Sequence, residues 1–188
     1  MGRGVRPPQL AHVLLCGLLL LCSFKDFRLN GYSAQRSLFV CADSALSESG
    51  GQSHVGGGIG NTASGYASFV GGGSSNDAAA LTSTVSGGSS NTADGTCSTI
   101  AGGRDNDVDG DYTSVGGGWD NNANSLLATV AGGGGNQALG PYGFIGGGSG
   151  NTVKQYWSTV GGGYANKATN WYVVFVVWKW SCGLGLFG

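Results

Sequence analysis

Four aspartates lie close together in the middle of the chain, within the segment D-N-D-V-D-G-D. They are Asp105, Asp107, Asp109 and Asp111. Carboxylates at alternate positions followed by glycine are typical of the first half of a calcium-binding loop. The twelfth position of such a loop carries a bidentate glutamate, but here it is Gly116. We therefore favour a solvated acidic turn, keep the four aspartates as calcium candidates, and assign no cofactor.

Catalytic groups of other kinds are scarce. Nucleophilic catalysis requires a nucleophile with a base beside it, and His54 has no acid or base partner near it in the sequence. The glycine triplets are not followed by the Gly-Lys-Ser/Thr of a phosphate-binding loop. We predict that the chain is not an enzyme.

The composition is unusual for a globular domain. Glycine accounts for 39 of 188 residues, and charged residues make up only 10% against a typical share of about 25%. A net charge of −1 gives no basic footprint, so we expect no nucleic-acid partner. Such a composition is compatible with a flexible linker, an unfolded tract or a repeat fold with narrow coils.

A strict 15-residue period decides between these alternatives. A β-branched residue recurs at every fifteenth position: Val55, Val70, Val85, Ile100, Val115, Val130, Ile145 and Val160. Gly-Gly follows two and three residues later in each copy, and a small apolar residue follows eight residues later. Six residues after each β-branched residue comes an asparagine: Asn61, Asn76, Asn91, Asn106, Asn121, Asn136, Asn151 and Asn166. This register predicts a repeat fold.

Each position of the repeat has a physical interpretation. The β-branched residue, preceded mostly by Ser, Thr or Phe, favours a short strand, and Gly-Gly suits a corner. Asparagine tolerates the left-handed region, so we place it at the end of that corner. The Asn-x-Ala segment is then a second short strand, closed by a turn that often contains glycine, as at Gly65 and Gly95.

These elements predict an all-β fold, a parallel β-roll or β-solenoid of about eight 15-residue coils. Stacked coils pair strand on strand about 4.8 Å apart. The Val/Ile and Ala positions point inward, and the asparagines are expected to stack as a hydrogen-bonded ladder. The glycine content excludes helix, and glycine does not recur at every third residue as collagen requires.

The predicted core is thin, with one Val or Ile and one small residue per coil. We therefore expect a homo-oligomer that buries a second apolar surface. The residues twelve positions after the β-branched residue offer one in the later coils: Leu127, Tyr142, Trp157 and Tyr172. Exposed aromatics such as Trp119, Tyr156 and Tyr164 are candidates for stacking on sugars, although we favour the interpretation that they pack against neighbouring faces of the protein.

Residues 56–73 and 84–103 carry the repeat most clearly, as GGGIGNTASGYASFVGGG and TVSGGSSNTADGTCSTIAGG. They resemble the head repeats of trimeric autotransporter adhesins of the YadA-like type, in a 15-residue variant. The resemblance implies a left-handed, trimeric roll that binds extracellular matrix, glycan or other cell-surface ligands.

The two ends of the chain differ from the repeat. Arg3 and Arg6 precede an apolar run over residues 10–22, which is typical of a signal peptide, with a short uncleaved anchor as the alternative. We predict a signal peptide and leader over 1–34, an N-terminal cap over 35–52, the repeat solenoid over 53–170 and a hydrophobic tail over 171–188. The tail is open to interpretation as a cap, an anchor signal or a truncation.

Together these features predict a non-enzymatic structural or adhesive repeat protein that is extracellular or on the cell surface. The alternative is an ice- or polysaccharide-binding solenoid. A threonine row directly before the β-branched positions favours that alternative, but Phe69 and Phe144 interrupt it. The row comprises Thr84, Thr99, Thr129 and Thr159.

Overall fold

A computed structural model describes residues 46–175 of the chain. The predicted signal peptide and leader, the first part of the predicted cap and residues 176–188 of the tail lie outside the described residues. Across the described part, no helix has the length and apolar character needed to cross a membrane.

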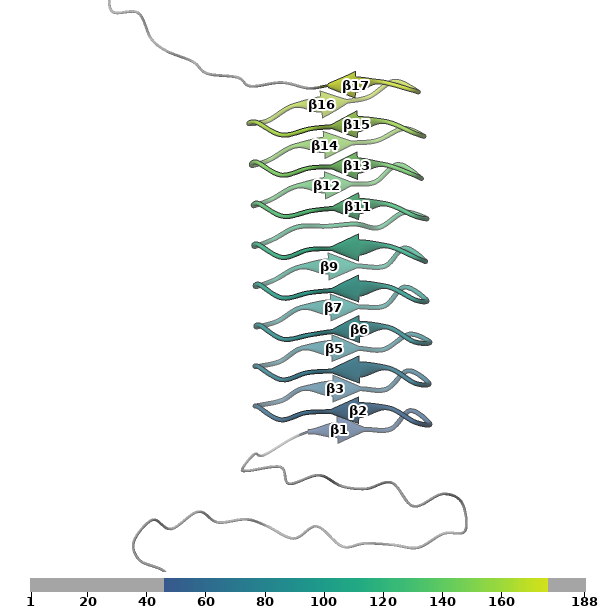
Figure 1. Ribbon diagram of the computed structural model, residues 1–188, viewed down its shortest axis with the longest axis vertical. Coiled ribbons are helices and arrows are strands. Elements are labelled where there is room, and N and C mark those ends of the chain that lie inside the picture. The colour runs from purple at the N-terminus through teal and green to yellow at the C-terminus, as the bar shows by residue number, and fades with distance from the viewer. Residues whose placement is uncertain (1–45, 176–188) are drawn as a thin grey trace, which may run out of the picture.

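The chain winds into a parallel β-solenoid with one coil for every 15 residues, which confirms the predicted fold class. Figure 1 shows two rows of arrows that point in opposite directions, joined by turns on both sides. We number the coils 1 to 8 by their β-branched residue, from Val55 to Val160. We number the columns by the distance of a residue from that position, so Asn61 is in column 6 of coil 1.

The first of the two rows, the Val sheet, contains nine strands that pair in parallel with a shift of 15 residues. Its strands are β2 His54–Val55, β4 Phe69–Val70, β6 Thr84–Val85, β8 Thr99–Ile100, β10 Ser114–Val115, β11 Thr129–Val130, β13 Phe144–Ile145, β15 Thr159–Val160 and β17 Val174–Phe175.

The second row, the Ala sheet, pairs in the same way on the opposite side of each coil. Its strands are β1 Ser47–Glu48, β3 Thr62–Ala63, β5 Asp77–Ala78, β7 Thr92–Ala93, β9 Asp107–Val108, β12 Gln137–Ala138, β14 Thr152–Val153 and β16 Lys167–Ala168. Isolated bridges from Asp107 to Asn122 and from Asn122 to Gln137 carry the row through coil 5.

A third row of contacts lies along one edge, in column 4. Isolated parallel bridges join these residues from Ile59 and Ser74 at one end to Ser149 and Tyr164 at the other. The two-strand coil predicted from the sequence did not include this row. Because column 4 contains residues as different as glycine, arginine and tryptophan, no side-chain pattern reveals it.

The core consists of the two predicted inward columns. Val or Ile of column 0 and Ala or Val of column 8 are 0–1% exposed in every coil. Successive residues of a strand point to opposite faces, so columns 7 and 9 point outward from the Ala sheet and column −1 points outward from the Val sheet. The predicted core is confirmed.

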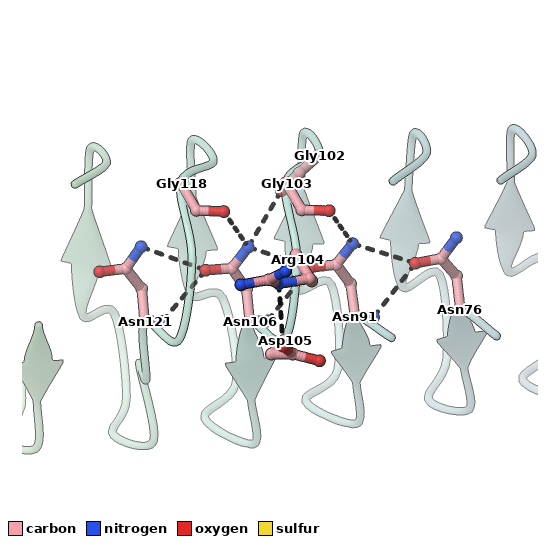
Figure 2. Close-up of polar contacts among 9 residues, drawn as sticks. All are labelled: Asn76, Asn91, Gly102, Gly103, Arg104, Asp105, Asn106, Gly118 and Asn121. Carbon is pink, nitrogen blue, oxygen red and sulfur yellow. Dashed lines mark hydrogen bonds and ion pairs between the residues drawn. The ribbon is translucent and has the colours of Figure 1, made fainter. Parts of the chain in front are cut away.

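The asparagines form the predicted ladder, but inside the solenoid. Asn106 is 1% exposed, and its Nδ2 donates to the carbonyl oxygens of Gly102 in its own coil and Gly118 in the next, at 3.1 and 3.2 Å. Its backbone N–H and Nδ2 also donate to Oδ1 of Asn91 at 3.1 and 3.0 Å (Figure 2). The side chain thus supplies the hydrogen bond of the Gly102 carbonyl and adds a second donor to the Gly118 carbonyl, which also accepts from the Arg104 N–H.

The prediction that the asparagines adopt left-handed backbone is wrong. Positive φ falls instead in column 5, from Gly60 at 65° to Ala165 at 53°, and in column 12. Gly-Gly forms the predicted corner, and its second glycine has φ between 87° and 99° in all eight coils. At Gly133 a Cβ would overlap the Gly148 carbonyl oxygen and lie 2.8 Å from Asn136 Nδ2. The corner therefore needs glycine in column 3 for both conformation and space.

Glu48 covers the N-terminal end of the stack. It stands in column 8, where the other coils have Ala or Val, and its Oε1 accepts a 2.7 Å hydrogen bond from the Val55 backbone N–H. Corresponding N–H groups in later coils belong to the strand ladder. A carboxylate at this position therefore satisfies a donor at the edge of the first described coils.

Candidate interaction surface

The calcium candidates do not converge. Asp105 lies in the column 5 turn beside Arg104, with its Oδ2 3.2 Å from the guanidinium Nε. Asp111 lies on the opposite corner, where its Oδ1 accepts a 2.9 Å hydrogen bond from the Thr96 N–H. The segment runs along one side of a coil from corner to corner, so it is not the single acidic turn that we predicted.

Asp107 and Asp109 are the two candidates that share a face, because they flank Val108 on the Ala sheet. Partial burial is the larger cause, and repulsion from Asp109 the smaller one, that raises the pKa of Asp107 above its usual value. Its Oδ2 accepts a long hydrogen bond of 3.4 Å from Asn122 Nδ2. Within residues 46–175, no group of three or more His, Cys, Asp or Glu side chains could hold a metal ion.

His54 lies at the N-terminal end of the Val sheet. Its Nδ1 is 3.5 Å from Glu48 Oε1, and its ring stacks on Phe69 with the centroids 5.9 Å apart. The expectation that His54 has no acidic partner is therefore wrong, because Glu48, six residues earlier in the chain, lies against its ring. Since that carboxylate also accepts from the backbone, the arrangement closes the end of the stack.

Apolar side chains gather on the corner formed by columns 11 and 12 of coils 5 to 8. This aromatic corner comprises Leu126, Leu127, Tyr142, Tyr156, Trp157, Trp171 and Tyr172, each between 39% and 67% exposed. The sequence pattern predicted the column 12 members, and it named Tyr156 of column 11 as an exposed aromatic but did not place the column 11 residues on the same surface. Trp119 and Tyr164 are also exposed, but they lie in column 4.

The rings of column 12 stack on one another along the solenoid. Tyr142 and Trp157 have centroids 5.2 Å apart with 14° between their planes, and Trp157 and Tyr172 are 5.2 Å apart at 6°. This spacing follows the distance of about 4.8 Å between paired strands. Trp157 is covered by a neighbouring ring on both faces and presents mainly its edge to solvent, whereas Tyr142 and Tyr172 each stack on Trp157 with one face.

The backbone under these rings is unfavourable for large side chains. Every column 12 residue from Ala67 to Tyr172 has φ between 52° and 58°, including Trp157 at 52°. Glycine would relieve this conformation, which is costly for a bulky residue, yet column 12 contains no glycine in any coil. Column 5, with the same sign of φ, uses glycine at Gly60, Gly135 and Gly150. Column 12 therefore carries large side chains in a strained backbone conformation. This combination makes the aromatic corner a candidate interaction surface.

The threonine row lies on the outside of the Val sheet. Thr84, Thr99, Ser114 and Thr129 pair in register on adjacent strands, which gives four hydroxyl side chains in succession. Phe69 and Phe144, 39% and 40% exposed, stand on either side of this run. The predicted row and its interruptions are thus both present on one flat face.

Comparison with models of known protein families found no match to this chain. A comparison with curated proteins found no match either.

Proposed function

We propose that the chain is a non-enzymatic structural or adhesive repeat protein that assembles with copies of itself and works outside the cell or at the cell surface. The exposed aromatic corner on a regular solenoid is the observation that carries the proposal. Large apolar patches on a solvent-exposed surface are typical of interaction sites.

Three features support this function. The Asn ladder and the backbone pairing between coils give a scaffold that holds surface side chains at a constant spacing. The aromatic corner offers apolar contacts without a charged side chain among its members. The apolar run near the N-terminus is typical of a secreted chain, and the repeat columns resemble YadA-like head repeats, which bind matrix and cell surfaces.

The geometry of the corner favours extracellular-matrix protein or another protein surface as the ligand. Sugars stack on exposed ring faces, whereas both faces of Trp157 and one face each of Tyr142 and Tyr172 are covered by a neighbouring ring. Ring edges pack favourably against the faces of aromatic side chains in an edge-to-face arrangement. A glycan ligand is therefore the less favoured alternative on this surface.

A retention assay tests the adhesive role. The full chain is applied to surfaces coated with matrix proteins, with glycans or with cells, and compared with the Tyr142→Ser/Trp157→Ser variant. We expect retention on a matrix protein or on cells and a loss of about tenfold or more in affinity for the variant, because buried aromatic side chains dominate interface energetics.

The matched control is Phe69→Ser/Phe144→Ser, which removes two aromatic side chains of similar exposure from the Val sheet. This control should bind like the original chain. Absence of retention on every surface would leave only a scaffold role, and equal loss in both variants would remove the aromatic corner as the contact.

Ice or polysaccharide binding is the second candidate, favoured by the run from Thr84 to Thr129 on the Val sheet. Regularly spaced hydroxyl groups on a flat face can match a repeating ligand surface. Thermal hysteresis of the purified chain measures this activity. Clear ice shaping that is lost in Thr99→Lys would replace the adhesive proposal.

A further inference from the structure

The outward columns of the Ala sheet carry opposite charges at their two ends. Columns 7 and 9 both point away from the core, because column 8 between them is buried. Coils 2 to 4 carry the acidic side chains, and coils 7 and 8 carry the only lysines of residues 46–175. We call this surface the dipolar face. Its charged members are Asp77, Asp94, Asp107, Asp109, Lys154 and Lys167.

The charges of the dipolar face lack counterions within the described part of the chain. The ion pairs found there are Glu48–His54 and Arg104–Asp105, which lie elsewhere. Burial raises the pKa of Asp77, and burial together with nearby aspartates raises that of Asp94. One buried oxygen of Asp77, Oδ1, also has no hydrogen-bond partner. These carboxylates are partly desolvated without a compensating cation, which is unfavourable unless something else supplies one.

Two of the three charges in column 7 lie symmetrically about coil 5. Asp77 in coil 2 and Lys167 in coil 8 are 90 residues, or six coils, apart. Asn122 in coil 5 lies midway between them. Reversal of the coil order about Asn122 therefore places each of these opposite charges at the position of the other.

Two of the three charges in column 9 have the same centre. Asp94 in coil 3 and Lys154 in coil 7 are 60 residues, or four coils, apart, and Asn124 in coil 5 lies midway between them. The coils stack in a straight column (Figure 1), so a reversal about coil 5 applies to both columns together. Two independent pairs thus share one centre.

We propose that two copies of the chain pair face to face and antiparallel through the dipolar face, about a two-fold axis that runs along the strand direction at coil 5. This axis places column 7 on column 7 and column 9 on column 9. Asp77 of each copy then lies opposite Lys167 of the other, and Asp94 lies opposite Lys154. The inference rests on the self-association in the proposed function and names the partner as a second copy, in place of the trimer implied by the resemblance.

Most of the remaining outward residues are compatible with this register. Asp107 meets the amide of Gln137, and Thr92 meets Thr152. Asn122 and Asn124 each meet their own copy at the axis. Asp109 opposite Leu139 is the one charge placed against an apolar side chain.

Other arrangements of two copies match the charges less well. Parallel copies would place Asp107 of one against Asp109 of the other in the same coil, and like charges in an interface are repulsive. An antiparallel pair shifted by one coil loses both Asp–Lys matches, and in one direction of shift it gains only Asp109 opposite Lys154. The charge pattern therefore favours a single register.

The interface is narrow. Eight coils at about 4.8 Å each, with two outward columns, cover on the order of 500 Å² per copy, below the roughly 800 Å² of a standard interface. We expect a weak dimer that exchanges rapidly and dissociates as salt screens the four ion pairs.

Sedimentation velocity of the full chain over a range of concentrations tests the pairing. We expect a monomer–dimer equilibrium at low salt that shifts to monomer at about 0.5 M salt. Lys154→Glu/Lys167→Glu should weaken the dimer about tenfold or more, and Asp77→Lys/Asp94→Lys should do the same. The quadruple variant that combines both exchanges should dimerise like the original chain, and so should Asp120→Lys, which changes a charge outside the face.

If the quadruple variant dimerises again, the double variants had lost the interface and not the fold. Circular dichroism checks that each double variant is folded. A trimer, a chain that stays monomeric at low salt, or a dimer unaffected by either double variant would each overturn the inference. Retention on matrix or cells is a separate measurement, so failure of the dimer and failure of the adhesive role are distinguishable.

Discussion

Oδ1 of Asn106 accepts two hydrogen bonds from Asn121 in the next coil, one from its backbone N–H and one from its Nδ2, both 3.1 Å long. The same relationship repeats from coil to coil through column 6. An amide side chain with every polar group paired therefore lies where a thin core would otherwise contain unpaired backbone groups.

Replacement of one ladder residue should destabilise the whole solenoid. Asn106→Ala leaves the Gly102 carbonyl and the Asn121 N–H without hydrogen-bond partners, at a cost of about 1–3 kcal/mol for each buried group. We expect a loss of about 3 kcal/mol in the free energy of urea unfolding. Asn124→Ala, on the outward column 9, is the control and should cost less than about 1 kcal/mol. Equal losses would contradict a special role for column 6.

Adjacent glycines of one corner should differ in their tolerance of a side chain. Gly133→Ala places a Cβ against the Gly148 carbonyl oxygen at φ 94°, whereas at Gly132 the nearest atom to a Cβ is 3.9 Å away. We expect Gly133→Ala to lower the unfolding free energy by more than about 2 kcal/mol, and Gly132→Ala to change it little. Thermal unfolding followed by circular dichroism compares the two. A tolerated alanine at position 133 would refute the close approach of the coils.

Relief of the left-handed backbone should stabilise the chain. Ala165 is exposed and has φ 53°, a conformation that costs a residue with a Cβ about 1–2 kcal/mol. Glycine removes this cost but adds chain entropy to the unfolded state. We expect Ala165→Gly to raise the unfolding free energy by about 0.5–1 kcal/mol. Ala79→Gly, at an exposed position without positive φ, should lower it, and the opposite order would be inconsistent with the assigned backbone.

The stability of the chain should depend on pH through Asp107. Burial and the nearby carboxylates raise the pKa of Asp107 in the folded state above the ordinary value of 3.8. The folded chain therefore binds this proton more tightly than the unfolded chain, and the resulting stability is present below pH 3.8 and lost as the pH rises through the raised pKa.

Asp107→Asn removes the charge and should raise the urea midpoint at pH 7. The gain should shrink as the pH falls and vanish below the ordinary aspartate pKa of 3.8, where both states of the original chain are protonated. Urea titrations at pH 7 and pH 3 at low protein concentration measure the difference. A gain of the same size at both pH values would point to a cause other than ionisation.

The sequence by itself determined the period, the parallel coil and the inward columns. Residue types such as those of Val70 and Ala78 recur every 15 residues among small and polar neighbours. Because apolar side chains are buried, these positions must face the core. The column 12 apolar surface also followed from spacing alone, because residues 15 apart must lie on adjacent coils.

Only the tertiary structure decided which residues take the turn conformations and that columns 11 and 12 form one surface. Asn106 has the local preferences of a turn residue, but hydrogen bonds to Gly118 and Asn121 in the next coil hold it inside. Conversely, Trp157 takes a left-handed conformation that its own preferences oppose. The conformation of these residues depends on backbone groups of neighbouring coils, and the local sequence carries no information on those contacts.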